Sequence, residues 1–381
     1  MFIHERPDWP RLQWDDRVVR DPLALVRHRQ GWLLGRMAAI GFDLQSAAVL
    51  ETLTRDVVTT SQIEGEQLDR AQVRSSIARH LGLDIGALVP SDRAVDGVVA
   101  MMLDATQRFD QPLTAERLYD WHAGLFPTGR SGITRIRVGA WRDGSAGPMQ
   151  VVSGPIGRER VHFQAPDAER LDAEMERFLV WFDAPPTTDP VIHAALAHLW
   201  FITIHPFEDG NGRIARALAD MALARAEGSP KRFYSLSAQI QADRTDYYTQ
   251  LERAQRGSLD VTQWLLWFLA SLGRAIDQAE TVLATVLQAA QFWQAHRDAP
   301  LTQRQRDMIT RLLGGFRGKL TTSKWALICK CSQDTALRDI EGLIALGILA
   351  KDTAGGRSTS YSLVLPVVDT GLTPPPPDPM P

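Results

Sequence analysis

The sequence predicts a mainly α protein that contains a β-hairpin and a second, smaller helical domain toward the end of the chain. Apolar residues recur at helical spacing through most of the 381 residues, whereas stretches with strand-like alternation are short and few. The stretch 132–166 is different, because Gly and Pro are frequent there and two short runs favour strands. After residue 300 the expected order is three helices and then two extended segments, which is typical of a winged helix.

Helical patterning covers the chain before the Gly- and Pro-rich stretch. Ser91 and Thr114 are expected N-caps there, since a short polar side chain accepts a hydrogen bond from the N–H groups of a first helical turn. The expected helices span 21–41, 44–65, 69–82, 91–109 and 113–126.

The Gly- and Pro-rich stretch is expected to form a hairpin or an extended flap, with strands at Gln150–Val152 and Val161–Phe163. Helical patterning then returns, and the expected helices span 167–184, 190–207, 212–228, 246–257 and 261–296. In the winged-helix domain the expected elements are a helix from Thr302, helices at 321–328 and 332–347, and extended segments at 348–352 and 358–365.

Composition divides the chain into four parts and narrows its class. We expect an N-terminal helical domain (1–90), a helical core (91–298), the winged helix (299–366) and a Pro-rich tail (367–381). The net charge of -3 gives no whole-chain electrostatic case for a nucleic-acid or membrane partner. No segment is long and apolar enough for a membrane span or a signal peptide, and Cys329 and Cys331 fit small buried hydrophobes better than half of a zinc site. We therefore expect a cytoplasmic protein.

The run IHPFEDGNGRIAR, residues 204–216, combines residue types that core packing does not require. Gly210 and Gly212 lie just before an expected helix, where free N–H groups and the helix dipole favour an anion. Asn211 can donate its side-chain amide to the same anion. Arg213 and Arg216 are spaced i, i+3, so both guanidinium groups project from one helix face and suit a polyphosphate.

Two further residues of the run supply chemistry. Asp209 can hold Mg²⁺ between phosphates, and His205 is the nearby group able to accept a proton at neutral pH. Together they indicate attack by a hydroxyl on a nucleotide phosphate, with the base beside an anion site. A helix start with ordinary caps and surface ion pairs explains a single Gly or Arg, but not the whole set.

The stretch HPFEDGNGRIAR resembles the signature loop of the Fic family, which reads His-Pro-Phe-any-Asp/Glu-Gly-Asn-Gly-Arg-any-any-Arg. The resemblance implies an all-helical Fic core with a β-hairpin flap and an adenylyltransferase that moves AMP from ATP to a Ser, Thr or Tyr hydroxyl of a target protein. Other transferred groups stay open, although the two arginines favour ATP. The implied roles are base for His205, Mg²⁺ ligand for Asp209, anion site for Gly210, Asn211 and Gly212, and phosphate ligands for Arg213 and Arg216.

Two other stretches resemble family features. GPMQVVSG, residues 147–154, is similar to the flap that pairs with an extended target segment, which makes Met149, Gln150, Val151 and Val152 docking residues; an ordinary surface hairpin is the alternative. In TTSQIEGE, the residues Thr60, Glu64 and Gly65 resemble the inhibitory pattern Ser/Thr-any-any-any-Glu-Gly/Asn. The resemblance implies that Glu64 pairs with Arg216 and keeps it from the γ-phosphate. A helix-end Glu before a C-cap Gly is the simpler alternative.

Several aromatic residues outside these motifs have either a role at the site or an ordinary role in packing. We expect His122 to be a core histidine. Tyr247 and Tyr248 lie where relatives place aromatics near the base; Tyr248 is the candidate for stacking on adenine, with helix packing as the alternative. The opening WPRLQWDD resembles the small domain that precedes the core in one Fic subgroup, with Trp9 and Trp14 as docking aromatics.

The winged helix leaves its partner open. The domain is locally basic, but its recognition-type helix carries Arg338 against Asp334, Asp339 and Glu341, and acids repel phosphates. Lys319, Lys324, Lys330 and Arg357 can still contact a DNA backbone. We favour protein docking or a homodimer contact over DNA. The alternative to an enzyme is a winged-helix DNA-binding regulator whose Fic core senses a nucleotide.

Overall fold

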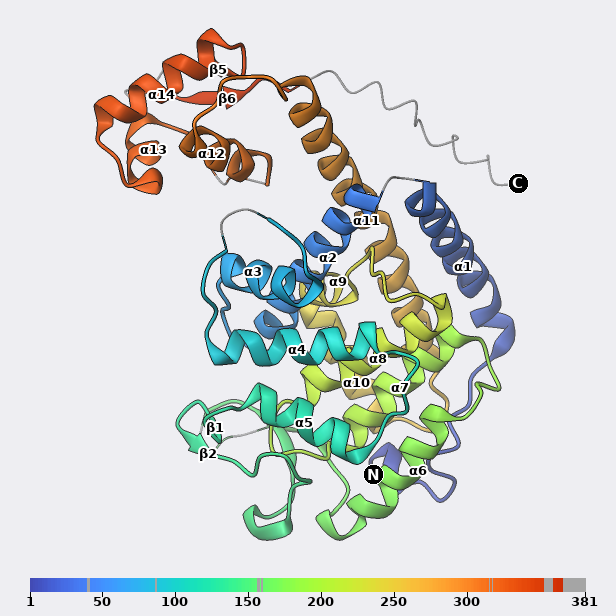
Figure 1. Cartoon of the computed structure of the whole chain (residues 1–381). Coiled ribbons are helices and arrows are strands. Elements are labelled where there is room, and N and C mark those ends of the chain that lie inside the picture. Colours follow the sequence, from blue (N-terminus) through green and yellow to red (C-terminus); the bar gives the residue numbers. More distant parts are fainter. Residues whose placement is uncertain are drawn as a thin grey trace. The chain divides into compact units, whose positions relative to one another are not determined.

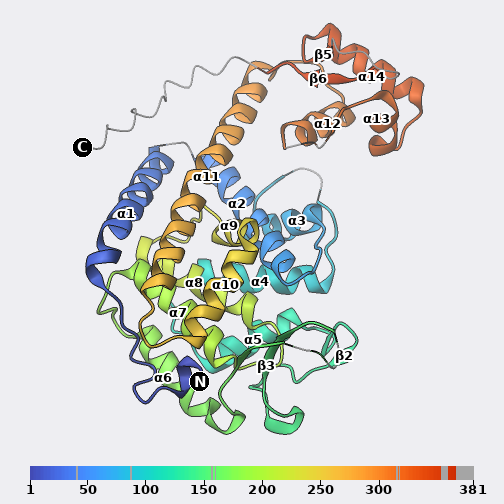
Figure 2. The same cartoon turned by 180° about the vertical axis from the view of Figure 1, so that it is seen from behind.

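The computed structural model describes residues 1–39, 42–85, 88–155, 158, 160–314, 316, 318–352 and 359–365. Helices dominate these residues (Figure 1; seen from behind in Figure 2), and the strands form two-stranded antiparallel sheets only. The mainly α fold predicted from the sequence is therefore confirmed. None of the helices in the described part of the chain is long and apolar enough to cross a membrane.

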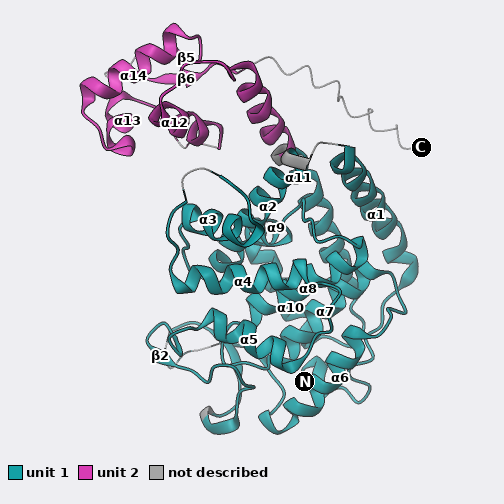
Figure 3. Cartoon of the chain, viewed as in Figure 1, with its two compact units in different colours: residues 1–280 teal, residues 281–381 magenta. Residues whose placement is uncertain are grey.

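The chain divides into two compact units, residues 1–280 and 281–381, which Figure 3 shows in different colours. The division falls inside α11 (Thr262–Ala295). The four-part division drawn from composition stays a prediction, and its Pro-rich tail lies outside the described residues.

Unit 1 carries most of the helices. Besides the first part of α11 they are α1 (Asp16–Ala39), α2 (Phe42–Ile63), α3 (Arg70–Leu81), α4 (Arg93–Gln107), α5 (Ala115–Leu125), α6 (Leu171–Asp183), α7 (Pro190–Ile204), α8 (Asn211–Glu227), α9 (Leu236–Ala242) and α10 (Arg244–Arg256). The short 3-10 turns are Ile3–Glu5, Gly144–Ala146 and Ala168–Arg170.

The centre of unit 1 is the pair α7 and α8, which have the most extensive contact of any two helices described. Asp189 caps α7 by accepting from the Val191 N–H, and Pro190 at the first position has no N–H to leave unpaired. Every residue from Val191 to Ile204 is buried. A helix that is buried on all sides belongs in a core, and α4 and α8 also pack together.

Some helix ends differ from the predictions. Thr114 caps α5 as expected, by accepting from the Arg117 N–H. Ser91 as the cap of α4 is wrong, because Asp92 accepts from the Val95 N–H and Ser91 instead donates to Asp96. The carboxylate one residue later is the acceptor that lies over the first turn.

For two helices of unit 1 the prediction was incomplete: one was predicted too short and the other was not predicted. The helix α1 begins before residue 21, where the prediction placed its start, and runs through Pro22; Asp15 accepts from the Arg17 N–H at its true beginning. The helix α9 was not predicted, since a helix this short gives almost no periodic signal. Ser235 caps it by accepting from the Ala238 N–H.

The predicted flap is a two-stranded hairpin. The strand β3 (Gln150–Ser153) pairs antiparallel with β4 (Arg160–Gln164), with a register shift between Val151 and Val152. All four residues of β3 are exposed. The predicted docking residue Met149 precedes β3, and its carbonyl accepts from the Ala165 N–H at 2.9 Å. A smaller hairpin, β1 (Arg130–Ser131) with β2 (Thr134–Arg135), was not predicted.

The N-terminal tryptophans differ in their packing. Trp9 is buried, its Nε1–H donates to Glu174 at 3.0 Å, and its ring lies edge-on to Trp200. Trp9 therefore docks the first residues on α6 and α7, as expected. The Nε1–H of Trp14 instead donates to Asp16 in its own segment.

Unit 2 has the order of elements expected for a winged helix. The helices are α12 (Gln303–Leu313), α13 (Thr322–Cys329) and α14 (Gln333–Ala345), and β5 (Leu349–Lys351) pairs antiparallel with β6 (Tyr361–Leu363). A single bridge between Leu320 and Tyr361 extends this pairing. Trp325, Ile340 and Ile348 are fully buried at its centre, and Cys329 and Cys331 pack partly buried against the same cluster.

The structure weakens one argument against DNA binding by unit 2, the repulsion of phosphates by the acids on α14. Of the acids on α14, Asp339 is buried and paired with Arg304, so its charge does not face solvent. Asp334 and Glu341 remain exposed, as does Arg338. Arg357, a predicted phosphate contact, lies outside the described residues.

Candidate active site

The turn after α7 places the predicted base. His205 ends the helix in the left-handed conformation, with φ 53° and ψ 57°, and its N–H donates to the Phe201 carbonyl at 3.0 Å. Positive φ is unusual for a residue with a side chain and is held only where the surroundings enforce it. It turns the chain out of α7 and toward the start of α8.

The hydrogen bonding of His205 selects the atom that can act as a base. Nδ1 lies 3.2 Å from the Ile202 carbonyl, which can only accept, so Nδ1 carries the proton and Nε2 keeps its lone pair. Burial lowers the pKa of His205 to about 4, and the charge of Arg142 acts in the same direction. The imidazole is therefore neutral at pH 7 and ready to accept a proton.

The start of α8 is suited to an anion. Gly210 has φ +80°, and a Cβ there would lie 2.9 Å from Cε2 of Phe126, so both the backbone and the space favour glycine. The N–H of Ile214 is bonded to the Gly210 carbonyl at 3.1 Å, inside the helix. The backbone N–H groups just before it lie in the first turn and lack such partners by the geometry of a helix start.

Asn211 has a different main contact from the one predicted. Its Oδ1 accepts from the Phe207 N–H at 3.0 Å and its Nδ2 donates to the Phe207 carbonyl at 2.8 Å. The side chain therefore closes the loop between Phe207 and α8. One Nδ2 hydrogen remains that could serve an anion.

The two arginines of α8 are buried and each is paired with an acid. Arg216, 1% exposed, donates from Nη2 to Glu64 Oε1 at 2.7 Å, and Arg213, 2% exposed, donates from Nη1 to Glu66 Oε2 at 2.7 Å. Arg216 also donates to the hydroxyl and the carbonyl of Thr60, at 2.8 and 2.9 Å. Nη1 of Arg216 and Nε of Arg213 have no hydrogen-bond partner in the described part of the chain. Buried donors of this kind indicate a polar ligand.

Glu64 lies directly over the start of α8. A Cβ built on Gly212 would be 2.3 Å from Glu64 Oε1 and 3.2 Å from Arg216 Nη1. Gly212 therefore allows the carboxylate to approach the first turn of the helix, which favours a negative charge. Gly65 follows with φ +86° and turns the chain away after α2. The pairing of Glu64 with Arg216 that the resemblance implies is therefore present, and the motif residues Thr60 and Gly65 contribute two bonds to the same guanidinium and the turn that follows α2.

Glu66 was missed by the sequence analysis. It lies two residues beyond Glu64 in a segment without regular structure, and its side chain is 47% exposed. A second acid close to Glu64 was the available signal, but spacing alone does not show which arginine it reaches.

Asp209 fits one ligand of a magnesium ion rather than a complete site. Oδ1 accepts from the Gly210 N–H at 2.6 Å, and Oδ2 accepts from the hydroxyl of Ser131, which was also missed. No group of three or more His, Cys, Asp or Glu side chains suited to a metal occurs among the described residues. Mg²⁺ commonly binds through one carboxylate together with substrate phosphates, so a single carboxylate beside an anion site fits it.

The aromatic candidates have different positions. Tyr247 is buried, and its hydroxyl lies 3.0 Å from His198 Nε2, which agrees with helix packing. The guanidinium of Arg244 lies 5.4 Å from the centre of the Tyr248 ring. Because Tyr248 is still 39% exposed, part of its ring remains available for stacking.

His122 is a core histidine that contacts the loop. Its ring is fully buried and stacks on Phe207 with centroids 4.1 Å apart. Nδ1 accepts from the Gly139 N–H at 3.1 Å, while Nε2 has no partner among the described residues. Burial lowers its pKa to about 4, so the ring is neutral.

The fold is mainly α, and its candidate site combines a helix start suited to an anion with a neutral histidine at the end of the preceding helix. Residues 112–223 match the model of the Fic/DOC family, and residues 2–83 match a domain of unknown function, DUF4172. The chain therefore contains a Fic/DOC domain, in agreement with the resemblance of the signature loop.

Relatives and solved structures agree with this assignment. Over 114 residues the chain is 36% identical to protein adenylyltransferase Fic of Nematostella vectensis, covering 29% of this chain and 25% of the relative. Over 223 residues it is 26% identical to protein adenylyltransferase fic-1 of Caenorhabditis elegans, covering 57% and 40%. The chain thus spans less than half of either relative. The crystal structure of a Fic family protein from Desulfovibrio desulfuricans G20 has a TM-score of 0.51 at 20% identity, covering 91% of this chain and 96% of that one, which supports the fold.

Proposed function

We propose that this protein is an adenylyltransferase that transfers AMP from ATP to a Ser, Thr or Tyr hydroxyl of a target protein, and that Glu64 inhibits it by pairing with Arg216. The observation that carries the proposal is the Glu64 carboxylate, which lies against Gly212 at the start of α8 and pairs with a buried arginine. An acid of the chain then occupies the place of a substrate phosphate. The names of the relatives support the transferred group.

In the proposed reaction, Nε2 of His205 accepts the proton of the target hydroxyl. The hydroxyl oxygen bonds to the α-phosphorus of ATP, and the bond to the leaving pyrophosphate breaks. The N–H groups at the start of α8 and the two arginines hold the phosphates and stabilise the charge that develops on them. Asp209 would hold Mg²⁺, which neutralises phosphate charge when it is bound.

Inhibition follows from the competition for Arg216. While Nη2 is paired with Glu64 and Nε with Thr60, only Nη1 is left for a γ-phosphate. The Glu64 carboxylate also repels a phosphate from the same helix start. ATP then binds weakly, or with its α-phosphate out of line for attack.

The target would dock on β3. The strand is exposed, pairs with β4 alone in the described part of the chain, and carries Val151 and Val152 at its surface. The other strand is fixed to α10, because Glu252 accepts from Arg160 and His162 at 2.8 Å each. A fixed hairpin with one unpaired edge suits an extended peptide. A homodimer or DNA contact through unit 2 stays a hypothesis from the sequence.

The test is incubation of the Glu64→Gly variant with ATP labelled in its α-phosphate. We expect self-labelling to rise on the order of ten- to a hundredfold over the unaltered chain, as for a typical coupling between two sites. His205→Ala in the Glu64→Gly background should abolish labelling while calorimetry still detects ATP. Labelling that stays at the level of the unaltered chain would contradict inhibition by Glu64, and ATP binding without any transfer would favour a nucleotide sensor.

A further inference from the structure

A segment that follows α5 runs along the loop between α7 and α8. Hydrogen bonds along the segment join them: Ser131 Oγ donates to Asp209 Oδ2, the Arg137 N–H donates to Glu208 Oε2 at 3.0 Å, and the Arg142 N–H donates to the Pro206 carbonyl at 2.8 Å. The segment and the loop run antiparallel, because residues later in the segment contact residues earlier in the loop. The segment therefore supports the loop along its length, and Arg142 lies at the end nearest His205.

The side chain of Arg142 is buried and bonds to backbone only. Its Nε donates to the His205 carbonyl at 2.9 Å, and its Nη2 donates to the carbonyl of Pro166. Burial lowers the pKa of Arg142, and the charges of Asp167 and Glu169 act in the opposite direction. Arg142 nevertheless forms no ion pair in the part of the chain that the structure describes. A buried arginine that has no carboxylate partner and holds the carbonyl of the predicted base is not explained by packing alone.

We propose that Arg142 is a positioning residue for the transfer reaction, which holds the His205 carbonyl and so keeps the imidazole directed at the target hydroxyl. The inference rests on the proposed AMP transfer, because it assigns His205 the role of base. Arg142 itself touches neither ATP nor target in this role.

The backbone of His205 needs such support. Its left-handed conformation is disfavoured for a residue with a side chain. The guanidinium holds the peptide that follows His205 through the His205 carbonyl, while the backbone N–H of Arg142 separately holds the Pro206 carbonyl. Without the bond from the guanidinium to the His205 carbonyl, this peptide can rotate, and the imidazole turns with it. A shift of about 1 Å in a reacting group can slow a reaction by as much as a hundredfold.

The loop has separate supports at its two ends. The Arg142 side chain holds the His205 carbonyl, whereas the Asn211 side chain holds the backbone of Phe207 near the start of α8. Loss of Arg142 should therefore disturb the base and leave phosphate binding intact. Loss of Asn211 should weaken phosphate binding. A merely structural role for Arg142 would not separate these effects.

The experiment uses the full chain in the Glu64→Gly background and compares maximal labelling rate at saturating ATP with ATP affinity from calorimetry. We expect Arg142→Gln to lower the maximal rate about 10- to 100-fold while the Kd for ATP changes less than about twofold. Asn211→Ala should raise that Kd. Arg142→Lys, which keeps one charged donor, should recover part of the rate.

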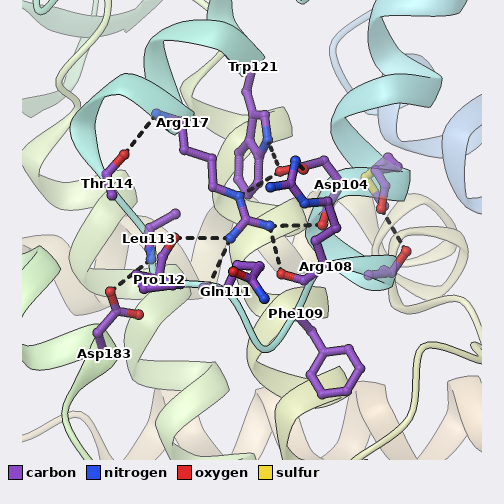
Figure 4. A network of polar contacts seen from close by, with 12 residues as sticks. Asp104, Arg108, Phe109, Gln111, Pro112, Leu113, Thr114, Arg117, Trp121 and Asp183 are labelled. Atoms are coloured by element: carbon purple, nitrogen blue, oxygen red, sulfur yellow. Dashed lines mark hydrogen bonds and ion pairs between the residues drawn. The ribbon is translucent and has the colours of Figure 1, made fainter.

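A matched control is available at Arg117 in the first turn of α5, which also holds backbone carbonyls, those at the end of α4 and in the connection to α5. Figure 4 shows its guanidinium amid the carbonyls of Asp104 and Arg108, which accept at 2.9 Å each, and those of Gln111 and Pro112. It also pairs with the Asp104 carboxylate. Arg117→Gln should lower the melting temperature without lowering the maximal rate at a temperature where the protein is folded.

The outcomes separate this inference from the proposed function. If the Glu64→Gly parent transfers no AMP, the proposed function fails and this inference fails with it. If the parent transfers AMP and Arg142→Gln keeps the full rate, or loses rate and ATP affinity by the same factor, the positioning role is overturned. Should Arg142→Gln fail to fold by circular dichroism, Arg142→Lys decides: a lower rate at unchanged ATP affinity supports the role, and an unchanged rate overturns it.

Discussion

At the scale of single residues, the candidate site is held by charges that neutralise one another. Arg213 and Arg216 are buried on one face of α8, and each meets an acid from the segment after α2. A buried guanidinium without a counter-charge is unfavourable, so removal of an acid leaves a strong site for an anion. In the proposed function, Glu64 and Glu66 take the place of two substrate phosphates, so nucleotide binding measures the effect of removing them.

We expect Glu66→Gln to raise ATP affinity in the Glu64→Gly background by about two- to fivefold, because Arg213 Nη1 becomes available to a phosphate. The effect is modest, since Glu66 is nearly half exposed and such pairs are weak. Calorimetry with ATP and Mg²⁺ measures it. Glu51→Gln is the control, because Glu51 pairs with Arg70 and Arg74 away from the site. Equal affinities for the single and double variants would refute a role for Glu66 in nucleotide binding.

At the scale of elements, a buried polar cluster fixes α2, the helix that leads to Glu64, to α8, the helix that carries the arginines. Arg232 donates to Asp220 and Glu227 of α8 at 3.0 Å each. Gln30 of α1 reaches Glu227 at 2.7 Å, and Ser235 donates to Asp56 of α2 at 2.5 Å. Burial, with Asp56 nearby, raises the pKa of Asp220 well above its usual range. The cluster thus joins α1, α2 and α8 in the core.

Arg232→Met should lower the free energy of unfolding by about 3–5 kcal/mol, because it leaves buried carboxylates without their counter-charge. Urea denaturation at neutral pH measures the change. Arg29→Met removes an exposed pair with Asp277 and should cost no more than about 1 kcal/mol. Similar costs for the two variants would show that the buried cluster contributes no special stability.

At the scale of the whole molecule, several histidines are buried in unit 1 without positive charge. Burial lowers the pKa to about 4 for His122, His193 and His205, and to about 3 for His198. In the unfolded chain these rings titrate near pH 6.5. The unfolded state therefore binds more protons between about pH 6.5 and pH 4, and stability decreases as the pH falls through this window.

We expect the melting temperature of unit 1 to be nearly constant above about pH 7 and to fall steadily from about pH 6.5 to pH 5. Most carboxylates titrate below that window, so histidines dominate the change. Calorimetry across this range measures it, and His193→Gln, away from the signature loop, should flatten the dependence. A melting temperature that does not change between pH 7 and pH 5 would contradict neutral burial of these rings.

Local chemistry was predictable wherever it depends on neighbours in the chain. The cap at Thr114, the helix pattern of α7 and the glycines at the start of α8 follow from turn geometry and periodicity, and the helical fold follows from them. The contacts Glu66 to Arg213, Arg142 to His205 and Ser131 to Asp209 were not predictable, because 60 or more residues separate each pair. A carboxylate or a guanidinium finds its partner only when packing has excluded water and fixed the distance, and no spacing within the sequence encodes that distance.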